Sequence, residues 1–192
     1  MSDHGFHVHG PHDHAVEHAA HGADKDPFSG MIAVMTALLA TIGALFSYMG
    51  GATQANAVLY KNTAAIKKTD ASNQWNYYQA KSNKQNLAEL AAALVPSERK
   101  ADYTKEAERY KVEKNEIKAV AEKFEAEATE WDHRSDHELH LHHRWAQATT
   151  ALQVSIALAA IALLTRRDWL KWGMFGVAGI GIVLGAAAVA QV

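Results

Sequence analysis

The sequence predicts an all-α membrane protein with three transmembrane helices and a long antiparallel helical hairpin, similar to a coiled coil, between the first and the second. Three observations predict this fold class. Uncharged runs of about 20 residues, enough to cross a hydrocarbon core, alternate with highly charged stretches. Side chains repeat every seven residues through the long charged stretch, as on one face of a helix. Pro96 interrupts this stretch near its middle, where a proline ends a helix.

Composition limits the classes of partner. The 192 residues carry 19 basic and 21 acidic side chains, a net charge of -2, so no basic surface for nucleic acid is expected. The chain has no cysteine, which excludes disulfides, thiolate metal sites and a cysteine nucleophile. We expect the lipid bilayer and further copies of this chain as partners, whereas the sequence identifies no other protein partner.

Residues 1–28 are expected to form a flexible tail, because apolar side chains are too sparse there to build a core. The tail is rich in histidine and is a candidate for loose metal binding. Its histidines are His4, His7, His9, His12, His14, His18 and His21.

Three segments are long and apolar enough to be transmembrane helices, namely 29–51, 146–165 and 170–190. Residues 166–171 form a basic turn between the second and the third. The third segment contains Gly181 and Gly185, a spacing that lets helices pack closely in membranes. None of the segments contains an ionisable side chain in its interior, which argues against an intramembrane proton or ion path.

Residues 52–145 are expected to form the extramembrane hairpin, with its turn near 95–98. Two stripes at seven-residue spacing predict its packing. The first is Leu59, Ile66, Asn73, Ala80, Leu87 and Leu94, taken as position a of a heptad, and the second is Tyr103, Tyr110, Ile117, Phe124 and Trp131. The stripes serve equally for packing within one hairpin or between chains.

Asparagines occupy several d positions of the first arm, where leucine is usual. They predict an oligomer with a ladder of paired amides or a water-filled interior, and the alternative is a solvated face. Asn62, Asn73, Asn76 and Asn83 are therefore candidates for facing an oligomer interface or a pore.

A second histidine cluster precedes the second apolar segment. Imidazole and carboxylate groups one helical turn apart can hold Zn²⁺ or another divalent metal. The candidate ligands are His133, Asp136, His137, His140 and His143. The alternative is a polar belt beside the bilayer, because spacing reveals no further ligand and no catalytic base. Zn²⁺ or another divalent metal is therefore a candidate cofactor, and the sequence assigns no cofactor firmly.

Four runs of the sequence, 24–28, 75–82 (WNYYQAKS), 140–144 and 164–169, resemble an uncharacterised family of bacterial membrane proteins, domain of unknown function 4337. The resemblance covers nearly the whole chain and is most specific at Trp75 to Lys81. It implies a bacterial inner-membrane protein with three spans and a helical middle, but no activity or ligand. Arg166, Arg167 and Lys171 in a short loop predict a cytoplasmic amino terminus and a periplasmic hairpin by the positive-inside rule.

These features predict a non-enzymatic oligomeric scaffold or assembly protein. The first alternative is a metal-binding or pH-responsive membrane protein that uses its histidines, which titrate near neutrality. An oligomeric channel ranks third. An enzyme is not expected, because no nucleophile motif, phosphate-binding loop or His-Glu-x-x-His sequence occurs.

Overall fold

A computed structural model of the chain describes residues 27–190. Within them the chain forms three α-helices and no strand: α2 (Pro27–Leu94), α3 (Ser97–Thr165) and α4 (Asp168–Val189). Each of the three is long and apolar enough to cross a membrane. Residues 1–26 of the predicted tail, with its seven histidines, lie outside the described residues. The last two residues of the tail, Pro27 and Phe28, begin α2.

The helices α2 and α3 are longer than the segments expected from the sequence. The apolar run and the charged arm that follows it form one continuous helix in α2, and α3 likewise joins the second arm to the second apolar run. Gly50 and Gly51 are helical, because the backbone hydrogen-bond ladder continues through them. The chain divides into two compact units, described separately below.

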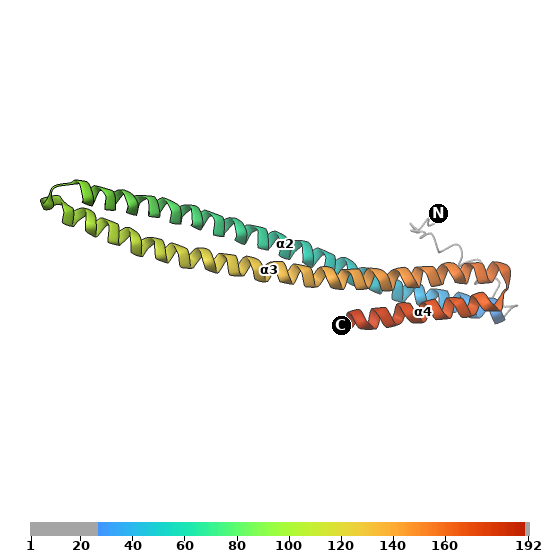
Figure 1. Ribbon diagram of the computed structural model, residues 1–192. Coiled ribbons are helices and arrows are strands. Elements are labelled where there is room, and N and C mark those ends of the chain that lie inside the picture. The colour runs from blue at the N-terminus through green and yellow to red at the C-terminus, as the bar shows by residue number, and fades with distance from the viewer. Residues whose placement is uncertain (1–26, 191–192) are drawn as a thin grey trace, which may run out of the picture. The chain divides into compact units, whose positions relative to one another are not determined.

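The first unit, here called the hairpin unit, is Ala55–Glu138. Its two arms are antiparallel parts of α2 and α3 that lie side by side (Figure 1). The arms are separated only by Val95 and Pro96, because proline cannot continue the hydrogen-bond ladder of α2. The Pro96 carbonyl then accepts the Arg99 N–H at 3.1 Å as α3 begins.

Small side chains fill the seam of the hairpin unit. Most of the buried alanines lie at seven-residue steps: Ala57, Ala64 and Ala71 on α2, and Ala107, Ala121 and Ala128 on α3, the last three including a gap of fourteen. Ala88 of α2 is also buried, outside this repeat. The aromatic stripe of the second arm lies in this seam, with Ile117 buried and Tyr110 half-buried. The buried Ser135 hydroxyl donates to the Ala57 carbonyl at 2.8 Å and ties the arms together.

The first-arm stripe is not in the seam, so its assignment to position a of the hairpin core is wrong within one chain. Leu59, Ile66, Leu87 and Leu94 are 59%, 61%, 65% and 76% exposed. Alanines two residues before Leu59 and Ile66 take the buried positions instead. Two residues correspond to about 200° around a helix, so the stripe lies on the face of α2 opposite α3.

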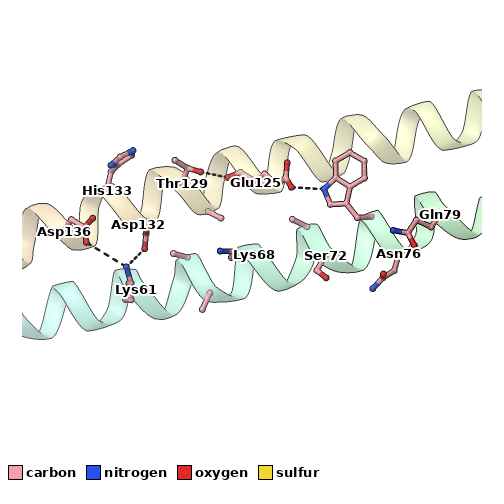
Figure 2. A pocket seen from close by; sticks show the side chains of 15 residues that line it. Lys61, Lys68, Ser72, Asn76, Gln79, Glu125, Thr129, Asp132, His133 and Asp136 are labelled. Carbon is pink, nitrogen blue, oxygen red and sulfur yellow. Dashed lines mark hydrogen bonds and ion pairs between the residues drawn. The ribbon is translucent and has the colours of Figure 1, made fainter.

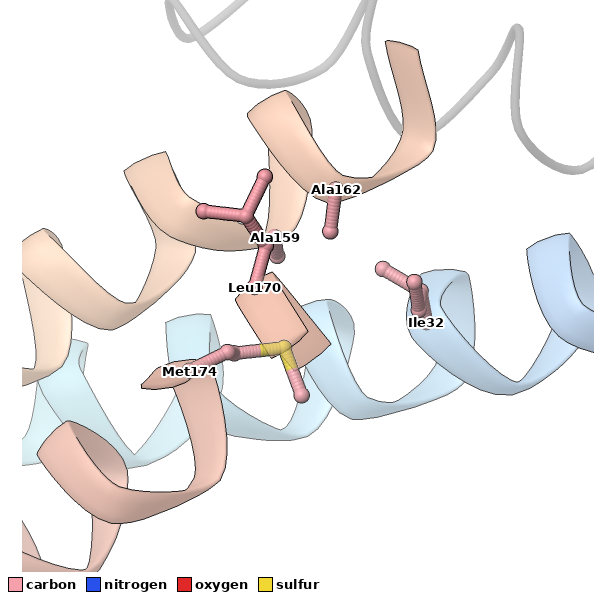
Figure 3. Close-up of a cluster of buried hydrophobic side chains, with 5 residues drawn as sticks. All are labelled: Ile32, Ala159, Ala162, Leu170 and Met174. Atoms are coloured by element: carbon pink, nitrogen blue, oxygen red, sulfur yellow. The ribbon is translucent and has the colours of Figure 1, made fainter. Parts of the chain in front are cut away.

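The second unit, here called the three-helix unit, comprises the described parts of Met1–Gln54 and Leu139–Val192. One apolar cluster joins Ile32 of α2, Ala159 and Ala162 of α3, and Leu170 and Met174 of α4 (Figure 3). A second cluster contains Leu39, Leu152, Ile156 and Ala178. The buried Ser155 hydroxyl donates to the Met174 carbonyl at 2.8 Å, which satisfies a polar group inside this core.

The turn between α3 and α4 is shorter than expected. Only Arg166 and Arg167 lie outside the helices, and Lys171 belongs to the first turn of α4, where its Nζ lies 3.1 Å from Asp168 Oδ1. Arg166 adopts a left-handed conformation with φ of 52°, the conformation that commonly follows the last residue of a helix.

Candidate functional site

A groove with a volume of about 920 Å³ lies on one face of the hairpin unit, between α2 and α3 (Figure 2). Alanines of the seam, including Ala64, Ala71 and Ala128, line its floor. Polar and charged side chains rise on both sides because the seven-residue repeat places them next to the alanines. Those labelled in Figure 2 are Lys61, Lys68, Ser72, Asn76, Gln79, Glu125, Thr129, Asp132, His133 and Asp136.

At one end of the groove Lys61 bridges two carboxylates of α3. Its ammonium donates to Asp132 Oδ1 at 2.5 Å and lies 3.9 Å from Asp136 Oδ1. The hydrogen bond to Asp132 raises the pKa of Lys61 above its ordinary value. The same bond lowers the pKa of the Asp132 carboxyl. Both groups are therefore held in their charged forms.

Trp75 forms the wall further along the groove. Its indole N–H donates to Glu125 Oε1 at 2.8 Å, and its ring meets Tyr78 edge-on at a centroid distance of 5.5 Å. Lys68 is exposed on the same helix, one heptad from both Lys61 and Trp75. The groove thus has a basic side on α2 and an acidic side on α3.

A second set of interactions crosses the seam outside this groove. Lys81 donates to Glu113 Oε2 at 2.5 Å and lies 5.5 Å from the centre of the Tyr110 ring. Lys67 lies 2.7 Å from Glu127 Oε2. The hydrogen bond from Lys81 lowers the pKa of Glu113, and that from Lys67 lowers the pKa of Glu127. These pairs join positions of α2 and α3 at matching heights and so define the register of the hairpin.

The predicted metal ligands do not form a cluster. Among residues 27–190, no three His, Asp or Glu side chains lie close enough to hold a metal together. The five candidates are all exposed on α3. Asp136 is paired with Lys61, while His133 and His137 line a shallow hollow of about 350 Å³ that also touches Tyr60.

Sequence reasoning missed the role of His142. Its Nδ1 lies 2.8 Å from the Gly50 carbonyl oxygen, which can only accept, so the imidazole donates. A Cβ at Gly50 would lie 3.2 Å from Cβ of Trp145, and the Trp145 ring lies 5.2 Å from that of Phe46. The sequence contained one indication of this role. Ala128, Ser135 and His142 are spaced by seven residues, so His142 lies on the face of α3 that contacts α2.

The asparagine candidates lie on the exposed surface of α2. Asn62, Asn73, Asn76 and Asn83 are all exposed, and Asn76 also reaches the rim of the groove.

Both candidate glycines lie at close contacts between helices. A Cβ at Gly181 would lie 2.9 Å from Leu152 Cδ2 and 3.3 Å from the Ala148 carbonyl oxygen. A Cβ at Gly185 would overlap the Phe46 ring.

The groove formed by Lys61, Trp75 and Asp132 was also not predicted as a site from the sequence. Lys61, Lys68 and Trp75 follow one another at seven-residue steps on the first arm, and Glu125 and Asp132 do so on the second. Opposite charges at the same periodicity on two antiparallel arms were the signal that could have found them.

Comparison with known proteins identifies the family. Residues 28–191 match the family model described as domain of unknown function (DUF4337), and because the match covers most of the chain, the chain belongs to this family. No curated protein and no solved structure gives a significant match.

Proposed function

We propose that this member of the DUF4337 family is a non-enzymatic, oligomeric protein of the bacterial inner membrane, with a scaffold or assembly role for its extramembrane hairpin. The observation that carries the membrane part is the small buried share of its apolar segments. Only 22%, 33% and 28% of the residues in the most apolar windows of α2, α3 and α4 are buried within the chain. Apolar helical surface of this extent requires lipid or other protein around it.

Side chains at the start of α4 support a position at the membrane interface. Trp169 and Trp172 are 65% and 70% exposed, and tryptophan is enriched where headgroups meet the hydrocarbon core. The adjacent Arg166 and Arg167 favour a cytoplasmic turn by the positive-inside rule. The hairpin is then periplasmic.

This topology can be tested directly because the chain has no cysteine of its own. Ser97→Cys places a thiol at the exposed hairpin turn, and Arg167→Cys places one in the turn between α3 and α4. In intact spheroplasts a membrane-impermeant maleimide is expected to label the first variant and not the second. Labelling of only the second variant would reverse the proposed orientation.

The charges of the hairpin unit support a role without catalysis. General acid–base catalysis requires groups with a pKa near the working pH. Here the hydrogen bond between Lys61 and Asp132 moves both pKa values away from neutrality, and the bond between Lys81 and Glu113 does the same. Such pairs stabilise one arrangement of the helices rather than exchange protons with a substrate.

Two measurements on the full chain test the proposal. The protein is expected to stay in the membrane pellet after an alkaline carbonate wash, and extraction by the wash would refute membrane spanning. Its mass in a mild detergent, with and without a chelator, is expected to be that of a defined oligomer in both cases. A monomer would refute assembly, whereas dissociation only after chelation would assign the assembly to metal binding by the histidines.

A further inference from the structure

We propose that the outer face of α2 in the hairpin unit forms a parallel coiled coil with the same face of a second copy of this chain. This inference rests on the proposed oligomer and deepens it by naming the surface and the partner. The surface, here called the outer stripe, consists of the a and d positions of five heptads and the a position of a sixth: Leu59, Asn62, Ile66, Thr69, Asn73, Asn76, Ala80, Asn83, Leu87, Leu90 and Leu94.

The outer stripe contains large apolar side chains that are mostly exposed, and one of them, Leu87, also lines a shallow hollow beside Tyr103 and Tyr110 of α3. Leu59, Ile66, Leu87, Leu90 and Leu94 are between 56% and 76% exposed. They follow one repeat over 36 residues, or about 54 Å of helix at 1.5 Å per residue. Between Ile66 and Leu87 the stripe is polar apart from Ala80, so its large apolar side chains form two groups, one at each end.

Within one chain, α3 packs against a different face of α2. The buried Ala64 and Ala71 face the seam, and the ion pair of Lys67 with Glu127 flanks it. The a positions of the outer stripe lie about 200° around the helix from these alanines, and its d positions lie about 140° from them. The two faces can therefore be occupied at once, and α2 would lie between its own α3 and the α2 of a second copy.

The asparagines identify the occupant as a second copy. Asn73 at position a and Asn76 at position d lie between the apolar ends of the stripe. A side-chain amide carries both donors and an acceptor, so it must meet a similar polar group if it is covered. In a parallel pair of identical helices every asparagine meets its own copy at the same height, which is the arrangement in which asparagine sets register in coiled coils. An apolar partner helix would leave these amides unpaired.

Charge along the flanks favours the same pairing. The positions on either side of the outer stripe contain one acid, Asp70, and one base, Lys84, among ten residues from Thr63 to Ala93. In a parallel coil each g residue lies beside the e residue five positions further along the other helix. Asp70 then lies beside an alanine and Lys84 beside Gln79, so that two identical copies bring no like charges together.

The outer face of α3 is different. Arg109, Glu116, Lys123 and Glu130 repeat there at seven-residue steps and are all exposed. A strongly charged helix face of this kind is normally solvated. Of the two arms, α2 is therefore the one that offers a surface for a second copy.

Cysteine crosslinking tests the surface. Leu87→Cys places a thiol at an a position of the outer stripe, and Glu89→Cys places an exposed thiol two residues further along α2, away from the stripe. In membranes treated with a mild oxidant, the first variant is expected to form a disulfide-linked dimer because equivalent a positions meet across a parallel coil. The second is expected to remain monomeric on a non-reducing gel.

A charge substitution gives a second measurement. Asn73→Asp would place like charges against each other in the coil, whereas Asn115→Asp is the matched change at an exposed position of α3. At neutral pH the first is expected to weaken assembly by about tenfold or more, and the second to leave it unchanged. Lowering the pH below about 4, where aspartate is protonated, is expected to restore assembly of the first variant.

The outcomes distinguish the proposed oligomer from the proposal that the outer stripe is its interface. A native oligomer that fails to crosslink through Leu87→Cys, or crosslinks equally through both thiols, would overturn the outer stripe as the interface and leave the proposed function standing. Equal assembly of both aspartate variants would also overturn it. A native chain that is monomeric in the membrane would overturn both.

Discussion

Enlarging one alanine of the hairpin seam tests whether small side chains hold α2 and α3 together. Ala121 is 0% exposed in the seam, and Ala119 is exposed on the same helix two residues earlier. Ala121→Leu adds three carbon atoms where the structure leaves no open surface. Overpacking of this kind costs about 1–3 kcal/mol of the free energy of unfolding.

A stabilising effect of Ala121→Leu would change the free energy of unfolding by a comparable amount. If the arms could separate freely, three newly buried carbons would stabilise the hairpin by about 2.4 kcal/mol, at about 0.8 kcal/mol each. We expect the destabilising effect to prevail, because the ion pairs Lys67–Glu127 and Lys81–Glu113 join the arms on both sides of this position and would have to lengthen. The sign of the change therefore reports whether the seam is rigid.

The assay is thermal unfolding of the full chain in mild detergent, followed by the helical circular dichroism signal. For a chain of this length each kcal/mol corresponds to roughly 2–4 °C in Tm. Ala121→Leu is expected to lower Tm, while the control Ala119→Leu is expected to change stability by less than about 0.5 kcal/mol. Equal Tm values for both variants, or a higher Tm for Ala121→Leu, would refute the argument that the alanine seam determines the packing.

Three further predictions concern other contacts. Gly181→Ala is expected to weaken the packing of α4, because its Cβ would lie 2.9 Å from Leu152 Cδ2. The control is Gly179→Ala, whose Cβ would meet nothing within 4 Å. Unfolding in detergent compares the two variants, and equal stability would contradict the close contact. Because Lys81 lowers the pKa of Glu113, the stability from this pair is present above the unfolded carboxyl pKa of about 4.5 and is lost as the pH falls through the folded value. Glu113→Gln should therefore reduce the acid dependence of Tm and the exposed Glu116→Gln should not; identical pH profiles would exclude the effect. If the α3 histidines bind metal, their combined replacement by alanine should reduce the Zn²⁺ titration signal, and an unchanged signal would exclude this site. The residues replaced are His133, His137 and His140.

The parts of the fold that sequence predicted depend on neighbouring residues along the chain. The break between the arms follows from Pro96, which lacks a backbone N–H wherever it stands. The apolar character of the three helices follows from uncharged runs that are visible without any structure. The candidate site was less predictable, because Lys61 and Asp132 are 71 residues apart and meet only once the register of the hairpin is known.

The sequence by itself therefore determined that the described chain is helical, where its helices separate and which segments are apolar, since helix periodicity, proline and hydropathy are local properties. Only the tertiary structure decided which face of each arm lies inside. On hydrophobicity alone Leu59 and Ile66 belong in the core, yet Ala57 and Ala64 are buried there and the leucine stripe faces outward. The physical reason is volume: the aromatic side chains of α3 already occupy the seam, so the opposing helix fits most closely with its smallest side chains, and close packing between two helices cannot be deduced from either helix alone.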